Sequence, residues 1–211
     1  MLSNDVLVLG AGGHAKVVIS VMIAAGIGIK AILDDDPDKW GNKLFGVKID
    51  GPISACDREE KQPAILAIGD NSTRMRFARL LGGRTWMTVI HPHTYIHPTV
   101  QIGEGTVVFA GAIIQPDVRI GAHCIVNSGA TIDHDSVIGD FVHVAPGVNL
   151  AGNVLLADGV FLGIGSAVIT GKRVGEWTTV GAGGVVVSDL PAHAVAAGVP
   201  AKVMRYRRLP Q

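Results

Sequence analysis

The sequence predicts two domains of different fold class: an α/β, half-Rossmann-like domain over residues 1–90, and a parallel β-helix over residues 91–211 that ends in a C-terminal tail. Three observations support this prediction. An aliphatic residue recurs at every sixth position from Ile96 onward, a spacing that neither a helix nor an alternating strand produces. The first ninety residues lack that period. They open instead with a buried-strand pattern, a glycine-rich turn and an apolar run of helical character.

The composition is that of a folded globular chain with a sizeable core. Of its 211 residues, 48% are hydrophobic and 17% are charged, with 18 basic and 18 acidic side chains. Because the charges balance, we expect no binding to nucleic acid or to an anionic membrane. The longest apolar stretch, residues 17–29, is shorter than the roughly 20 residues of a membrane-spanning helix. It also lacks the basic start of a signal peptide, so we expect a cytoplasmic protein.

The first domain has the pattern of a parallel sheet. Strand Val6–Leu9 leads into the turn GAGGH at residues 10–14, and a phosphate could bind at the N-terminus of the helix that follows. We expect a second strand at Ile29–Leu33, which ends in three aspartates, and a third at residues 64–68, which ends in Gly-Asp-Asn. Ligands of parallel α/β sheets bind at the carboxyl ends of such strands. Residues 36–63 show no clear pattern.

The glycine-rich turn also fits a dinucleotide fingerprint, which leaves an alternative open. Gly10, Gly12 and Ala15 have the required spacing, and Asp34 follows at the distance of a ribose-binding acid. Ninety residues hold only half of a full dinucleotide fold, so a mononucleotide half-site is the more economical interpretation. The glycines could also serve the tight turn alone.

The second domain carries a six-residue repeat without interruption. The repeating aliphatic residues are Ile96, Ile102, Val108, Ile114, Ile120, Val126, Ile132, Ile138, Val144, Leu150, Leu156, Leu162, Val168, Val174, Val180 and Val186. Four residues after each one, the side chain is usually small or β-branched. We expect three faces per coil of eighteen residues, with the aliphatic ladder on the axis and the small residues in the corners. Glycines such as Gly103, Gly121 and Gly139 are expected to relax the turns.

The repeats IGEGTV, IGAHCI and IGDFVH, with GVPAK at residues 198–202, resemble the hexapeptide-repeat acyltransferase superfamily. That resemblance implies a left-handed β-helix and a homotrimer. Together with GAGGH, LDDD and AIGDN in the first domain, the chain resembles the bacterial nucleotide-sugar N-acetyltransferases of bacillosamine and perosamine biosynthesis and the related sialic-acid O-acetyltransferase-like proteins.

The family resemblance implies acetyl-CoA as co-substrate and a nucleotide-linked 4-amino-6-deoxysugar, GDP-perosamine-like or UDP-linked, as acceptor. It places the nucleotide sugar in the first domain, where the matching residues are Gly12, Gly13, His14, Asp34, Asp35 and Gly69. It places acetyl-CoA in a groove between neighbouring β-helices, where the matching residues are His143, Gly152, Ile164 and Ala182.

His134 is the best candidate for a general base. It lies at an outward position of its repeat, between Asp133 and Asp135, and these carboxylates can fix its tautomer and raise its basicity. The resemblance places the catalytic histidine here, followed by a carboxylate, which is Asp135 in this chain. With eighteen residues per coil, Gly152 stacks over His134, and its amide could meet the thioester oxyanion.

The spacing of two histidines predicts a site shared between chains. His143 lies nine residues from His134, which is half a coil, so the two belong to different sides of one β-helix. They could share a site only across a subunit interface.

Three alternatives stay open at this stage. The first is a γ-class carbonic anhydrase, which has the same β-helix. Such an enzyme needs three histidines that converge on a metal ion, including a closely spaced pair, and the repeats of this chain lack that pair. Cys56 and Cys124 show no zinc spacing, so we expect reduced thiols and no metal. A non-catalytic nucleotide-binding scaffold would leave His134 unexplained. O-acetylation of a sugar hydroxyl is the remaining rival.

Overall fold

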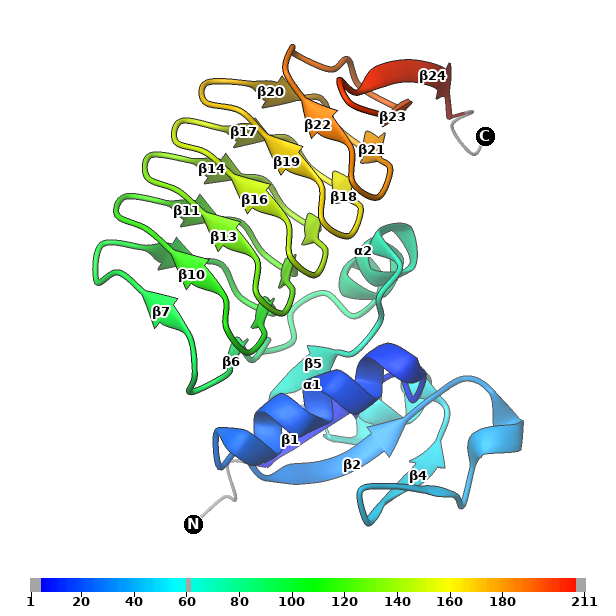
Figure 1. Cartoon of the computed structure of the whole chain (residues 1–211). Coiled ribbons are helices and arrows are strands. Elements are labelled where there is room, and N and C mark those ends of the chain that lie inside the picture. The colour runs from blue at the N-terminus through cyan, green and yellow to red at the C-terminus, as the bar shows by residue number, and fades with distance from the viewer. Residues whose placement is uncertain (1–4, 60–61, 208–211) are drawn as a thin grey trace. The chain divides into compact units, whose positions relative to one another are not determined.

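The computed structural model describes residues 5–59 and 62–207, and the chain divides into two compact units, Met1–Pro92 and His93–Gln211. Figure 1 shows an α/β unit and a coiled unit of short strands. Residues 1–4, 60–61 and 208–211, which the predicted domain ranges include, lie outside the described part. In that described part, every helix is too short or too polar to cross a lipid bilayer.

The first unit is a five-stranded sheet with two α-helices. Its elements are β1 (Val6–Leu9), α1 (Gly13–Ala24), β2 (Ile29–Leu33), the 3₁₀ helix η1 (Pro37–Lys39), β3 (Lys43–Leu44), β4 (Val47–Gly51), the 3₁₀ helix η2 (Ile53–Glu59), β5 (Ala64–Leu66), α2 (Asn71–Leu80) and β6 (Val89–Ile90). The strand order is β3-β4-β2-β1-β5. β1, β2, β4 and β5 run parallel, whereas β3 and β4 form an antiparallel hairpin.

The core of this unit lies around the central strand. All four residues of β1 are buried, as expected for a strand covered on both faces. One cluster of buried side chains comprises Leu7, Leu9, Leu33, Ile53, Cys56, Ala64, Leu66, Phe77 and Trp86. Helix α1 buries Ala15, Val18, Ile19, Val21 and Met22. This packing holds the carboxyl ends of β1, β2 and β5 at one edge.

Two details of this sheet differ from the prediction. The segment without an assigned pattern contains β4, where Val47, Ile49 and Gly51 are more buried than the residues between them. That alternation has the period of two typical of a strand. The third predicted strand is shorter than expected, because β5 ends at Leu66 where its neighbour β1 ends at Leu9.

The second unit is a parallel β-helix with three faces. Face 1 contains β7 (Tyr95–Ile96), β10 (Ile113–Ile114), β13 (Thr131–Ile132), β16 (Asn149–Leu150), β19 (Ala167–Val168) and β22 (Val185–Val186). Face 2 contains β8 (Gln101–Ile102), β11 (Arg119–Ile120), β14 (Val137–Ile138), β17 (Leu155–Leu156) and β20 (Arg173–Val174). Face 3 includes β9 (Val107–Val108), β12 (Ile125–Val126), β15 (His143–Val144), β18 (Phe161–Leu162) and β21 (Thr179–Val180).

The hexapeptide period corresponds directly to this architecture. Paired residues such as Ile114 and Ile132 are eighteen positions apart, so each coil contains three repeats. Every aliphatic residue of the ladder from Val108 to Val186 is buried, whereas Ile96 and Ile102 in the first coil are half-buried. The β-helix ends in β23 (Ala194–Ala197) and the antiparallel β24 (Lys202–Tyr206), whose five residues are all exposed.

The expected role of the repeat glycines is wrong. Gly103, Gly121 and Gly139 do not have left-handed backbone angles. A Cβ atom at Gly121 would lie 2.7 Å from the carbonyl carbon of Gly139 in the next coil, and the other two positions are similarly close to backbone. These glycines therefore permit close stacking of coils. The left-handed corner positions are occupied by other residues, including Asp117 (φ 63°), Asp135 (φ 58°) and several further glycines.

Candidate active site

His134 lies at the corner that follows strand β13. The chain leaves face 1 through Asp133 and His134, and Asp135 then turns it toward face 2 with a φ of 58°. The His134 amide donates a hydrogen bond to Asp133 Oδ1 (2.8 Å). The Nδ1 atom of His134 lies 2.7 Å from Asp135 Oδ2, and both side chains are about half exposed, at 54% and 53%.

The two carboxylates make His134 more basic. The hydrogen bond that His134 donates to Asp135, followed by the charge of Asp133, raises the pKa of His134 above its ordinary value of 6.5. In the neutral ring, the tautomer with its proton on Nδ1 can donate a hydrogen bond to Asp135. Nε2 then carries the lone pair and is the ring atom available to remove a proton from a substrate.

Gly152 lies against the imidazole of His134. A Cβ atom at Gly152 would be 2.6 Å from both Cε1 and Nε2 of His134, so only glycine leaves room for the ring in this position. The Asn153 amide donates to the His134 carbonyl (2.9 Å), which ties the two turns together. Within residues 5–59 and 62–207, the Gly152 amide donates no hydrogen bond. A free amide donor therefore adjoins the basic nitrogen.

A shallow hollow of about 460 Å³ opens on face 1 next to Gly152. Its lining consists of Asn149, Leu150, Ala151, Ala167, Val168, Ile169 and Thr170. Most of these side chains are apolar, and Ile169 is 41% exposed. The hollow thus offers an apolar surface beside the candidate amide donor.

The structure does not bring His143 to His134 within one chain. His143 belongs to β15 on face 3 and is buried, whereas His134 follows β13 on face 1. His143 Nε2 lies 3.2 Å from Asn127 Nδ2, and its ring meets Phe161 edge-on with 5.1 Å between ring centroids.

The other two residues assigned to acetyl-CoA lie together at the corner after face 3. Ile164 follows β18 and is 59% exposed. Ala182 follows β21 one coil later and is also exposed. The two turns stack closely, because a Cβ atom at Gly163 would lie 2.6 Å from the Ala182 nitrogen. The four candidate residues therefore form two separate groups on one chain.

In the first unit, the glycine-rich turn leaves the N-terminus of α1 open. Gly10 has a φ of 112°, and a Cβ there would lie 2.9 Å from the Ala67 carbonyl oxygen, so this position requires glycine. Gly12 and Gly13 are exposed and have open space where a side chain would be. Helix α1 has no side-chain cap and no acidic residue in its first turn. Its positive dipole end is therefore available to an anion such as phosphate.

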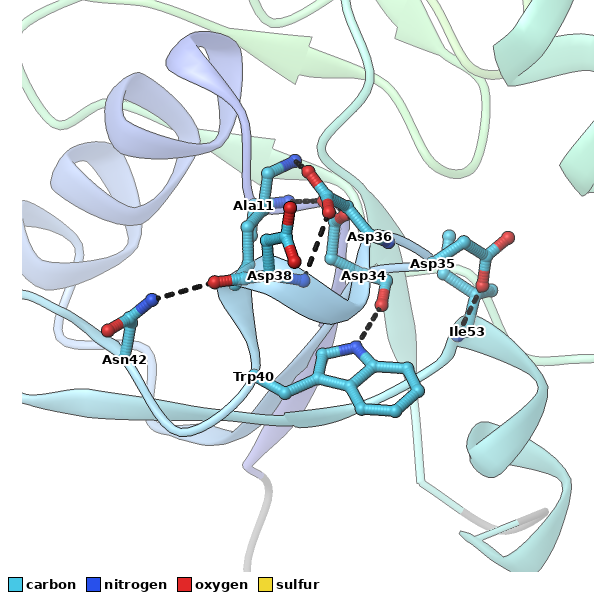
Figure 2. A network of polar contacts seen from close by, with 9 residues as sticks. Ala11, Asp34, Asp35, Asp36, Asp38, Trp40, Asn42 and Ile53 are labelled. Carbon is cyan, nitrogen blue, oxygen red and sulfur yellow. Dashed lines mark hydrogen bonds and ion pairs between the residues drawn. The ribbon is translucent and has the colours of Figure 1, made fainter.

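Asp34 ties this turn to the end of β2. As Figure 2 shows, its carboxylate lies at the centre of a polar network. Asp34 Oδ2 accepts a hydrogen bond from the Ala11 amide (2.6 Å), and Oδ1 accepts from the Asp36 amide (2.9 Å) and from Lys39 Nζ (3.1 Å). The indole of Trp40 donates to the Asp34 carbonyl (2.8 Å).

These contacts keep Asp34 ionised. Burial is the largest single effect and raises the pKa of Asp34. The hydrogen bonds from the amides of Asp36 and Ala11 and from Lys39 together outweigh it, so the pKa lies below the ordinary value of 3.8. We expected Asp34 to be a substrate-binding residue, but both of its carboxylate oxygens accept hydrogen bonds from within the chain.

Asp35 is placed differently. Its Oδ1 accepts a hydrogen bond from the Ile53 amide at the start of η2 (2.8 Å). The side chain is exposed, and Figure 2 shows the second carboxylate oxygen directed away from that contact. Asp35 therefore retains an acceptor oxygen for a ligand, in contrast to Asp34.

His14 and Gly69 lie against each other near Arg74, a buried arginine that we did not expect from the sequence. A Cβ at Gly69 would be 3.6 Å from His14 Cβ. Burial, followed by the charge of Arg74, lowers the pKa of His14 to about 4, so the ring is neutral at physiological pH. Arg74 donates to the carbonyls of Ile68 (3.0 Å) and Gly69 (3.2 Å) and to Asn71 Oδ1 (2.9 Å).

The sequence contains a signal for Arg74. Helix α2 buries Asn71, Arg74 and Phe77, which are spaced at i, i+3 and i+6 along one face. A charged residue within such a stripe is expected to have internal hydrogen-bond partners. In the part of the chain that the structure describes, no three His, Cys, Asp or Glu side chains are grouped in a way that could hold a metal ion.

The contrast between the two aspartates predicts a difference in stability. We expect Asp34→Asn to lower the thermal unfolding midpoint at pH 7 by several degrees, because Asn has no charge and a single acceptor oxygen where Asp34 uses both of its oxygens, a loss of about 1–3 kcal/mol. Asp35→Asn, the matched control, keeps an acceptor for Ile53 and should leave the midpoint nearly unchanged. Circular dichroism melts test this, and equal losses in both variants would contradict it.

The pH dependence of the Asp34 variant has a definite sign. Because the folded-state pKa of Asp34 is depressed, its stabilisation is present above the unfolded-state pKa and is lost as pH falls through the folded-state value. The difference in thermal unfolding midpoint between wild type and Asp34→Asn should therefore become smaller below about pH 4.

Two domain families match the chain. Residues 5–81 match the PglD N-terminal domain, and residues 99–134 match the bacterial transferase hexapeptide family of six repeats. UDP-N-acetylbacillosamine N-acetyltransferase of Bacillus subtilis is 40% identical over 115 residues, which cover 51% of this chain and 52% of that protein. An uncharacterised protein of Acanthamoeba polyphaga mimivirus is 37% identical over 107 residues, 51% of this chain and 21% of that protein. The chain thus spans about half of the length of the first of these relatives and about a fifth of the length of the second.

Solved structures match nearly the whole chain. PerB from Caulobacter crescentus, in complex with CoA and GDP-perosamine, is 40% identical with a TM-score of 0.89, and the match covers 95% of this chain and 97% of PerB. The acetyltransferase domain of PglB from Neisseria gonorrhoeae, in complex with acetyl coenzyme A, is 33% identical with a TM-score of 0.88 and coverages of 96% and 100%. These likenesses confirm the predicted fold class, a Rossmann-like domain followed by a left-handed β-helix. The chain belongs to the hexapeptide-repeat acetyltransferase family that includes the perosamine and bacillosamine N-acetyltransferases.

Proposed function

We propose that this protein transfers an acetyl group from acetyl-CoA to the 4-amino group of a nucleotide-linked 4-amino-6-deoxysugar, either GDP-perosamine-like or UDP-linked. The observation that carries the proposal is the placement of His134, which is hydrogen-bonded to Asp135 and lies directly against Gly152. The relatives support it, since perosamine N-acetyltransferase was solved with CoA and GDP-perosamine, and a PglB domain with acetyl coenzyme A. We place the reaction in the cytoplasm, in accord with the sequence-based expectation.

The geometry suits the chemistry of acyl transfer. As the sugar amine attacks the thioester carbonyl, Nε2 of His134 removes the amine proton, and a carbon–nitrogen bond forms. Negative charge then develops on the thioester oxygen, where the Gly152 amide can donate a hydrogen bond. Collapse of the tetrahedral intermediate breaks the carbon–sulfur bond, and the CoA thiolate leaves and takes up a proton. Asp135 stabilises the imidazolium that forms in between.

The first unit is proposed to hold the nucleotide. The exposed Gly12 and Gly13 amides at the start of α1 suit the diphosphate, because the helix end is positive and uncapped. Asp35 offers a carboxylate oxygen to a ribose hydroxyl. His14 and Gly69 form the adjoining wall, and Asp34 holds the turn in place rather than contacting the ligand.

The active assembly is proposed to be a homotrimer with acetyl-CoA bound between neighbouring β-helices. His134 with Gly152 forms one half of each site, and His143 with Ile164 and Ala182 forms the other half. These halves lie on different faces of a single chain, so one neighbour must supply the second half. The apolar hollow beside Gly152 supports this, because it would be covered in such an arrangement.

O-acetylation of a sugar hydroxyl is the second candidate. A hydroxyl loses its proton far less readily than an ammonium group does, so it depends more strongly on a basic histidine. The raised pKa of His134 fits that demand. Release of free thiol from acetyl-CoA, measured with UDP-, GDP- and dTDP-linked 4-amino-6-deoxysugars and with the matching hydroxy sugars, separates the candidates. Thiol release with none of these acceptors would contradict both.

The pH dependence tests the base. We expect His134→Ala to lower kcat by about 10²-fold or more, with a nearly constant KM for acetyl-CoA. The acidic limb of the wild-type profile should lie above pH 6.5, because the neutral ring is required and its pKa is raised. Asp135→Asn should move that limb to lower pH and reduce kcat less. If the acidic limb of Asp135→Asn lies at the same pH as that of wild type, Asp135 does not raise the pKa of the catalytic base.

Gly152 provides a second test of the same site. A methyl group at this position would occupy the space of the His134 ring, which is exposed and can move away. We therefore expect Gly152→Ala to lower kcat by more than about tenfold while its unfolding midpoint changes little. Gly129→Ala is a useful control, because open space surrounds that corner glycine, although its positive φ of 65° makes it lose some stability. Normal kcat in Gly152→Ala would contradict the assigned geometry.

Complementation tests the shared site. His134→Ala and His143→Ala should each be impaired alone. When the two variants are co-expressed, random mixed trimers should regain about a quarter of wild-type activity, since one subunit pair in four then combines an intact His134 with an intact His143. Sedimentation should show a trimer. An active monomer, or the absence of any regained activity, would refute the composite site.

A further inference from the structure

Three buried hydroxyls in the β-helix make the same kind of bridge to a later coil. Thr106 donates a hydrogen bond to the Gly121 carbonyl (2.9 Å) and accepts one from the Cys124 amide (3.0 Å). Thr178 donates to the Pro191 carbonyl (2.6 Å) and accepts from the Ala194 amide (3.1 Å). Both side chains are fully buried. In these two places the bridge serves the fold, because no candidate site residue lies in the turns that it holds.

Ser136 makes the third bridge, and it reaches the turn that contains Gly152. Its hydroxyl accepts a hydrogen bond from the Val154 amide (3.1 Å) and donates to the Ala151 carbonyl at a longer distance (3.4 Å). The Ser136 residue is fully buried. Its hydroxyl therefore holds both ends of the 151–154 turn from inside the β-helix.

The carbonyl of Ala151 and the amide of Gly152 belong to one peptide group. A trans peptide is planar, and its C=O and N–H point in opposite directions. When Ser136 holds the Ala151 oxygen inward, the Gly152 N–H is directed outward from the β-helix, where His134 lies against the Gly152 backbone.

The segment that contains His134 therefore also fixes the position of the Gly152 amide. Two consecutive contacts join the turns: Asn153 donates to the His134 carbonyl, and Val154 donates to Ser136. A hydrogen bond to the carbonyl also polarises a peptide and strengthens its N–H as a donor. A fixed donor needs no reorientation when charge develops on the substrate oxygen.

We propose that Ser136 is a positioning residue for acetyl transfer, which acts by fixing the Ala151–Gly152 peptide so that the Gly152 amide faces the thioester oxygen. This inference rests on the proposed function. Loss of the Ser136 hydroxyl should therefore lower kcat, whereas loss of the Thr106 or Thr178 hydroxyl should not.

The test compares matched variants. Ser136→Ala and Thr178→Val each remove one bridging hydroxyl, so both should lower the unfolding midpoint by a few degrees. Only Ser136→Ala should lower kcat, by about tenfold, which is less than the loss of a whole oxyanion donor. KM for acetyl-CoA and the acidic limb of the pH profile should not change, because neither cofactor binding nor the base is altered. Ser136→Thr should restore kcat, since threonine fits the equivalent corner at Thr106.

The possible results separate the two proposals. If wild type releases no thiol with any acceptor, the proposed function fails and the role of Ser136 fails with it. If wild type is active and Ser136→Ala loses no more kcat than Thr178→Val, only the role of Ser136 is overturned. A shifted acidic limb in Ser136→Ala overturns it as well. Should Ser136→Ala not fold, Ser136→Val gives the same comparison, because it also removes the hydroxyl, and the buried Val118 and Val142 show that valine fits the equivalent corner of other repeats.

Discussion

The backbone ladder between successive coils is the interaction on which the rest of the β-helix depends. Strands of only two residues pair in parallel at a constant offset of eighteen positions, and single short strands of this kind would not persist alone. The offset determines which side chains become neighbours. It places Gly152 over His134 and Ala182 over Ile164, and it separates His143 from His134. The length of the repeat therefore determines which residues of the candidate site lie next to each other.

Much of this arrangement could be predicted because the repeat is strictly periodic. Once the aliphatic ladder is recognised, the coil length and the stacking of Gly152 follow from counting. The middle of the α/β unit was less predictable, since the alternation there covers too few residues to identify a strand. Val47 and Ile49 carry a strand signal, but it spans only β4. The family resemblance supplied the handedness, which spacing alone does not contain.

The roles of individual polar residues could not be predicted from the sequence. Asp34 and Asp35 are adjacent and chemically identical, yet the Asp34 carboxylate accepts three internal hydrogen bonds through both of its oxygens, whereas the Asp35 carboxylate accepts one and keeps an open oxygen. This difference depends on which backbone amides the tertiary structure brings close to the end of β2. The same is true of Gly121, whose small size is needed for stacking of coils and not for a turn.

The left-handed backbone at Asp135 has a consequence for the residue type that lies beside His134. The corresponding corners one coil before and after are occupied by Asp117 and Asn153, with φ values of 63° and 60°. Short side chains with a polar group at the γ position tolerate this conformation better than most others. The corner therefore favours aspartate for its backbone alone. The carboxylate beside His134 therefore occupies a corner that has this backbone conformation in the neighbouring coils as well, and its presence adds no backbone strain of its own.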